Sequence, residues 1–160
     1  HSFGIMRHSL IIACLALMIV GCTSYKQIKP GSLGGGYHKE EVASGLVLLS
    51  GQTGAKAWSD FEAAWRIFYR RADELFGTGQ YDVILSKEFT FTPFNAPLIG
   101  PDPVVSVAHG FVLSHTSPFS RKEALARARE YIGINALLVG MKEPNQSGKA
   151  NAGNEPHGSP

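Results

Sequence analysis

Two histidines, His109 and His115, stand six residues apart, and they are the first candidates for metal chemistry. They lie in a segment, 104–115, whose sequence predicts a strand, on which both side chains share a face about 20 Å apart. One metal ion cannot bridge that distance. We therefore expect no metal site, and we expect His109, on the apolar side, to be a packed, hydrogen-bonded core residue.

The segment 50–56, Ser-Gly-Gln-Thr-Gly-Ala-Lys, places glycines and a lysine between a predicted strand and a predicted helix, where a phosphate-binding loop would lie. Such a loop needs four residues between its first glycine and a Gly-Lys pair, with Ser or Thr next. Here two residues separate Gly51 from Gly54, and an alanine stands on each side of Lys56. The spacing favours an ordinary turn between a strand and a helix.

Serine, histidine and acidic residues suited to a hydrolytic triad are present, but not within a Gly-x-Ser-x-Gly elbow. The acidic pair Asp60/Glu62 begins a predicted helix, where the helix dipole favours anions, so helix stability explains it. The sequence therefore predicts no catalytic residue and no cofactor.

Apolar side chains outside the predicted elements are candidates for contact with a partner, because exposed apolar residues often mark such contact. Trp58 precedes the first predicted helix, and Phe94, Leu98 and Ile99 lie in a proline-rich loop. We name these four residues as the candidate contact residues.

The beginning of the chain has the pattern of a targeting segment. One basic residue, Arg7, precedes an apolar run from Leu10 to Val20. The run is far shorter than the roughly 20 residues of a membrane-spanning helix and fits the apolar region of a signal peptide. The tetrapeptide Ile-Val-Gly-Cys that ends at Cys22 resembles the lipobox of bacterial lipoprotein signal peptides.

This resemblance implies cleavage between Gly21 and Cys22, with a diacylglyceryl group on the Cys22 sulfur and an acyl chain on its amino group. Two or more chains hold a protein firmly at a bilayer, since each buried methylene contributes about 0.8 kcal/mol. The residue after the cysteine is Thr23, not the aspartate that retains many lipoproteins at the inner membrane. The expected partner is thus a lipid bilayer, and the expected location is the outer membrane, facing the periplasm.

Composition limits the remaining function classes. The chain has 160 residues and a formal net charge of +2. The predicted mature part, 22–160, suits one domain. Arg66, Arg70 and Arg71 cluster, but acidic residues surround them, so we expect no nucleic-acid partner. Neither cysteine is available for a disulfide, because one lies in the signal peptide and the other is the lipidation site.

The organisation along the chain follows from local composition. Residues 1–5 precede the natural start at Met6 and are set aside, and 6–21 form the signal peptide. The glycine-rich stretch 22–37 predicts a flexible tether that holds a domain, 38–141, roughly 20 Å from the bilayer. Residues 142–160 lack apolar anchors, which predicts a disordered tail.

Within the domain, an apolar run predicts a strand over 42–49, and strict alternation of the two faces predicts a half-buried strand over 81–92. The segment 104–115 predicts a third strand. Helical spacing predicts a helix that ends at Gly77 and a shorter one from Ser120, both starting at Ser-x-x-Glu capping boxes (Ser59–Glu62 and Ser120–Glu123). Whether 136–141 is a closing strand stays open. The predicted fold is an α+β domain of order β-α-β-β-α, with helices on one face of a mostly antiparallel sheet and a ferredoxin-like arrangement as the nearest pattern.

Three short motifs, Gly36-Tyr37, the helix end 71–75 (Arg-Ala-Asp-Glu-Leu) and the strand start 79–82 (Gly-Gln-Tyr-Asp), resemble a group of small proteobacterial lipoproteins of unknown function. The resemblance spans about 36–83 and departs in the proline-rich loop 93–103. It implies a lipoprotein and brings no activity with it.

Two functions stay open from the sequence. The first is a non-enzymatic envelope lipoprotein that binds a protein partner or an envelope component. The second is a small-ligand or glycan-binding domain, with hydrolysis as a variant, that uses Trp58 and an open sheet face. An apolar patch at 94–99 would favour the first, and a concave pocket with convergent polar groups would favour the second.

Overall fold

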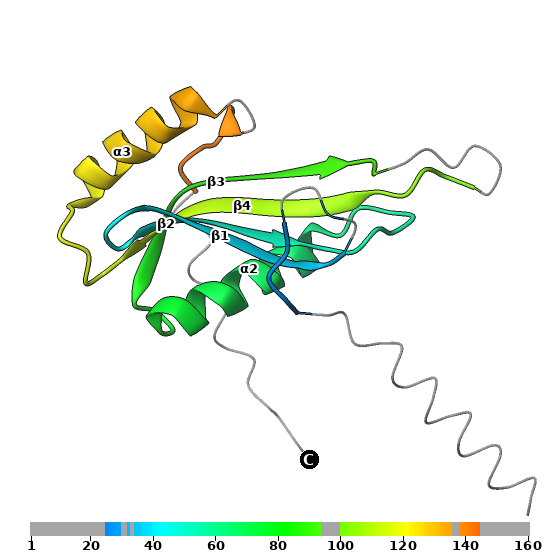
Figure 1. Ribbon diagram of the computed structural model, residues 1–160, viewed down its shortest axis with the longest axis horizontal. Helices are drawn as coiled ribbons and strands as arrows, with labels where there is room; N and C mark the ends of the chain where they lie inside the picture. Colours follow the sequence, from blue (N-terminus) through cyan, green and yellow to red (C-terminus); the bar gives the residue numbers. More distant parts are fainter. Residues whose placement is uncertain (1–24, 30–31, 33, 94–99, 136–137, 145–160) are drawn as a thin grey trace, which may run out of the picture.

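The computed structural model describes residues 25–29, 32, 34–93, 100–135 and 138–144 (Figure 1). Its α+β class and antiparallel sheet confirm the predicted fold class. The sheet has the order β1-β2-β4-β3, and every neighbouring pair is antiparallel. The elements are β1 (Gly36–Ala43), β2 (Leu46–Gln52), α2 (Phe61–Phe76), β3 (Tyr81–Phe91), β4 (Val105–Ser114) and α3 (Arg121–Ile134).

The predicted first strand, 42–49, is instead the middle of a hairpin. β1 and β2 join at a turn in which Gly45 has φ +71°. The prediction missed β1 because its charged sequence, His-Lys-Glu-Glu over 38–41, lacks the apolar run of a buried strand. Such charge is typical of an edge strand, which must not pair with another chain.

The two helices cover opposite faces of the sheet, so the prediction that both lie on one face is wrong (Figure 1). Alternate residues of a strand point to opposite faces. α2 packs on Val47 and Leu49 of β2, and α3 packs on the face that holds Leu46 and Leu48. Because β2 is buried at every position, each of its faces needs a covering layer.

The predicted helix up to Gly77 is confirmed as α2, with a different N-cap. Asp60, not Ser59, caps the helix, since its carboxylate accepts a hydrogen bond from the Ala63 amide at 3.0 Å. Gly77 follows the last turn with φ +88°, as predicted. At the second helix the predicted capping box is present, and Ser120 and Glu123 bond each other's backbone.

The predicted strands 81–92 and 104–115 are confirmed as β3 and β4. A bulge between Val83 and Leu85 interrupts the alternation in β3, so that the neighbours Ile84 and Leu85 are both buried. The prediction had put strict alternation through this point.

The sheet contains half of the ferredoxin-like pattern. Strand β4 lies between β2 and β3, so that β2, α2 and β3 form its split β-α-β unit. At the edge beside β2, where a strand following α3 would close that pattern, the structure has β1, which precedes the unit.

Both ends of the predicted domain extend further than the sequence indicated. Ile28, inside the predicted tether, is 8% exposed, and its amide bonds the Tyr37 carbonyl at 2.8 Å. Lys142, placed in the predicted tail, exchanges two backbone hydrogen bonds with Ser86 of β3. Neither helix in the described part of the chain combines the length and the apolar character needed to cross a membrane.

Candidate functional site

A pocket of about 340 Å³ opens where the N-terminal segment meets the β2–α2 loop and helix α2. This volume falls within the range of small-ligand sites. Tyr25 and Gly35 form one wall, Lys56 lies on the loop, and Arg66 and Arg70 project from the helix.

The loop that carries Lys56 is fixed by the start of β4. The amide of Thr53 donates to the Ser106 carbonyl at 3.0 Å, and the Ser106 amide donates to Thr53 Oγ1 at 3.1 Å. Ser106 Oγ in turn accepts from the Asp60 amide at 2.8 Å. Two backbone bonds between Lys56 and Val104 complete the attachment. The loop is therefore held at both ends before the helix begins.

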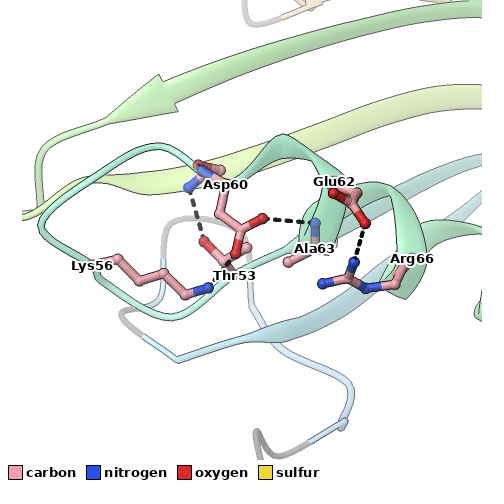
Figure 2. Close-up of polar contacts among 7 residues, drawn as sticks. Thr53, Lys56, Asp60, Glu62, Ala63 and Arg66 are labelled. Atoms are coloured by element: carbon pink, nitrogen blue, oxygen red, sulfur yellow. Dashed lines mark hydrogen bonds and ion pairs between the residues drawn. The ribbon is translucent and has the colours of Figure 1, made fainter.

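Asp60 links this loop to the first turn of α2. Its carboxylate pairs with Lys56 Nζ and also accepts from the Ala63 amide (Figure 2). The Lys56 bond and then the backbone bond hold the pKa of Asp60 below its usual range. Since both oxygens are engaged, this carboxylate is committed to structure and not to proton transfer.

The two pocket arginines form ion pairs along the outer surface of α2. Arg66 Nη1 lies 2.5 Å from Glu62 (Figure 2), and Arg70 Nε lies 3.3 Å from Glu74. The Arg66 and Glu62 side chains are 65% and 84% exposed. Exposed pairs of this spacing contribute only about 0.3–0.5 kcal/mol, so another anion can displace them at little cost.

Tyr25 fastens the N-terminal segment to the same helix. Its hydroxyl donates to Glu74 at 2.5 Å, and the Arg70 guanidinium lies 3.8 Å from its ring centre. Burial, followed by the bond to Glu74, raises the pKa of Tyr25 above its usual range. The ring also lies 5.1 Å from that of Tyr37 at the start of β1.

The charge of the lining is one-sided. Three of the described lining residues (Lys56, Arg66 and Arg70) are cationic, and none of the described lining residues is acidic. An anionic group of small size is the ligand that such a lining attracts.

Of the predicted site residues, only Trp58 lies within the described part of the chain. Trp58 is 66% exposed in the loop before α2, as expected for a contact residue. Gly21, Cys22, Phe94, Leu98 and Ile99 lie outside the described residues, so their predicted roles stay predictions.

His109 packs against the Phe89 ring, with ring centres 5.2 Å apart, which confirms the predicted packing, but the residue is only partly buried and lies outside the core. Its Nε2 lies 3.4 Å from Ser50 Oγ, while the buried Nδ1 has no hydrogen-bond partner among the described residues. Burial, aided by Lys87 and His38, lowers the pKa of His109 to about 4. A serine–histidine pair needs a third group that orients the histidine, and here no carboxylate bonds Nδ1.

His115 belongs to a different environment. Its Nε2 lies 3.0 Å from Asp82 at the surface. Within the described ranges, no three His, Cys, Asp or Glu side chains gather in a way that could hold a metal ion.

The sequence predicted an ordinary turn at Lys56, because the spacing does not fit a phosphate-binding loop. It predicted that Arg66 and Arg70 form a surface cluster whose charge is balanced by acidic neighbours. It missed the role of Tyr25, which it placed in a flexible tether. The i,i+4 spacing of Arg66 and Arg70 was the available signal that both project from one side of a helix.

Comparison with protein-family models, with curated proteins and with solved structures found no match to this chain.

Proposed function

We propose that this protein is a lipoprotein of the bacterial cell envelope, held at the outer membrane through acylated Cys22 and facing the periplasm. Its domain acts as a non-enzymatic module that binds a partner or an envelope component. The observation that carries the proposal is the order of residues from Met6 to Cys22: a basic start, a short apolar run and a lipobox-like end.

The arrangement of the domain agrees with a binding role. The acid at the pocket loop, Asp60, is engaged on both oxygens, and the pair Ser50–His109 lacks an orienting acid. The pocket instead presents cationic side chains whose exposed ion pairs are weak. Such groups attract and orient an anion, and they need perform no proton transfer.

Metabolic labelling with radioactive palmitate tests the anchor. We expect the unmodified chain to be labelled and cut before Cys22. Cys22→Ala removes the acceptor thiol, so it should lose the label and keep its signal peptide. Cys14→Ala is the matched control, because it removes the other cysteine from the predicted signal peptide and should leave labelling unchanged. Label that persists in Cys22→Ala would contradict the proposal.

The second candidate, a small-ligand or glycan-binding domain, is favoured by the 340 Å³ pocket. Its predicted location on an open sheet face beside Trp58 differs from where the pocket lies. Crosslinking in intact envelopes, followed by identification of the captured species, separates the two candidates. A captured protein supports the partner module, whereas a captured glycan or small anion supports the ligand-binding domain.

A further inference from the structure

We propose that the pocket lined by Tyr25, Lys56, Arg66 and Arg70 faces the bilayer that carries Cys22 and takes the phosphate of an anionic phospholipid headgroup. This inference rests on the proposed lipid anchor and adds to it the ligand of the domain. It commits to the membrane as the source of the phosphate.

The covalent chain limits how far the pocket can lie from the lipid. Tyr25 lines the pocket and follows Cys22 by three residues, which span at most about 11 Å when fully extended. Tyr25 is held on α2 by its bond to Glu74 and by the Arg70 guanidinium over its ring. The predicted 20 Å tether is therefore not available between the anchor and the pocket, and the pocket is the part of the described domain attached nearest to the bilayer.

The lining has the chemistry of a phosphate site. Guanidinium and ammonium groups bind phosphate oxygens through charge-assisted hydrogen bonds. Lys56 comes from the β2–α2 loop, Arg66 and Arg70 come from consecutive turns of α2, and all three border one cavity. Figure 2 shows Lys56 and Arg66 on the loop and on the helix that follows it. A small anion in this cavity can thus be contacted from two elements at once.

The acidic residues next to the pocket limit the area of surface that attracts an anion. Glu62 and Glu74 pair with the arginines along the outside of α2, and Asp60 pairs with Lys56. These carboxylates keep the surrounding surface close to neutral but do not line the cavity. The attraction is therefore confined to this one cavity and is not spread over a basic face. The highly exposed Arg66–Glu62 pair is weak enough for a phosphate to replace Glu62.

The lining residues next to the cationic side chains are of types that can contact the interface between water and a membrane. Tyr25 and Ile67 border the same cavity as the arginines. Tyrosine is enriched at the level of lipid headgroups, where its ring meets apolar atoms and its hydroxyl meets polar ones. A headgroup phosphate in the pocket would place the glycerol carbons of the lipid against these side chains.

The first test uses a soluble probe and needs no anchor. Dihexanoyl phosphatidylglycerol, kept below its micelle concentration, is titrated into the full chain while the amide signals of 63–70 are followed by NMR. We expect saturable shifts around the pocket. Arg66→Gln with Arg70→Gln should weaken binding roughly tenfold or more, since each basic group near an anionic lipid contributes to attraction. The matched control is Arg121→Gln with Arg129→Gln, which removes two ion-paired arginines from α3.

The second test places the acylated protein in nanodiscs with and without phosphatidylglycerol and measures hydrogen exchange. The amides of 63–70 should exchange more slowly with the anionic lipid, and the double α2 variant should lose this protection. Equal exchange in both lipids, or unchanged protection in that variant, overturns the inference. Equal protection by inorganic phosphate alone also overturns it, because the pocket would then recognise a soluble ion.

The two proposals fail separately. Absence of palmitate label on the unmodified chain, with probe binding intact, would refute the anchor and leave the phosphate site. Labelling of Cys22 without any probe binding would leave the anchor and refute the phosphate site.

Discussion

The two faces of the sheet are closed by helices that approach it in different ways. On the α2 face the small residues Gly51, Ala108 and Gly110 lie among Val47, Leu49 and Val112, and the helix comes close enough that a Cβ on Gly51 would lie 2.1 Å from the Ala64 carbonyl oxygen. On the α3 face the strands present large residues such as Leu48 and Phe111, which meet Ala124 and Ala128 of the helix. Contact between α3 and the strands is sparser than contact between α2 and the strands.

The difference indicates that α2 is held rigidly against the sheet, whereas α3 covers its face of the sheet more loosely. A helix that touches strand backbone has no room to shift, so α2 is a fixed support for the N-terminal segment and the pocket. The α3 face contains instead a row of polar residues across the sheet. In this row Ser50 of β2 lies opposite His38 of β1 and opposite His109 of β4. A change on the α2 face should therefore cost more stability than an equivalent change on the α3 face.

Gly51→Ala should have the largest effect. The new methyl group would meet the backbone of Ala64, which cannot rotate away, so we expect a loss of about 4 kcal/mol or more. Urea denaturation measures the loss. Gly54→Ala is the control, because the nearest atom to its Cβ would be 3.8 Å away. If both variants are equally stable, the close approach of α2 is wrong.

Truncation of apolar side chains compares the two helices directly. Phe68→Ala should cost about 3–4 kcal/mol, because its fully buried ring lies against Gly110 and leaves a void that the backbone cannot fill. Leu125→Ala on the partly buried side of α3 should cost about 1–2 kcal/mol. The comparison is measured by denaturation of both variants. A reversed order would show that α3, not α2, is the tighter layer.

The polar row on the α3 face predicts a pH dependence. The folded pKa of His109, about 4, lies below the ordinary value of 6.5, so the unfolded chain binds more protons between these values. The free energy of unfolding should therefore fall by up to about 3 kcal/mol as the pH drops from 6.5 to 4. Below pH 4 the contribution of His109 should change no further. Denaturation across this range measures it. His109→Gln should flatten the profile, and a profile that stays steep would assign the effect to other groups.

The smallest expected effect on stability concerns the N-terminal caps of the two helices. Ser120→Ala removes the capping box of α3 and should cost about 1 kcal/mol. Ser59→Ala should cost nothing measurable, because Asp60 caps α2. Thermal unfolding of the two variants checks the difference. An equal loss in both would mean that Ser59 also contributes to the start of α2.

Signals that act over a few residues were predictable. The apolar stripe of α2, the capping box at Ser120 and the strand that became β4 all follow from local residue patterns, and the structure has each of them. The N-cap of α2 was misassigned because Ser59 and Asp60 are both good caps and stand next to each other. The edge strand β1 was missed because its burial depends on β2, not on its own composition.

The candidate site was harder to predict than the fold. Its residues come from three segments, and each has an ordinary local explanation: Tyr25 as linker, Lys56 as turn, and Arg66 as a surface ion pair. No local spacing indicates that Tyr25 lies on α2, because the contact to Glu74 joins residues 49 positions apart. The proline-rich loop, predicted as the contact surface, lies outside the described residues and stays a prediction.

The sequence by itself determined the types of most elements, the α+β class and a lipobox-like segment whose lipidation stays a prediction, because periodicity, caps and short motifs are local properties of the chain. Only the tertiary structure decided that the helices cover opposite faces and that the segment at Tyr25 docks on α2. The physical reason is that burial on both faces of β2 and the docking of Tyr25 depend on contacts between distant residues, which local patterns do not encode.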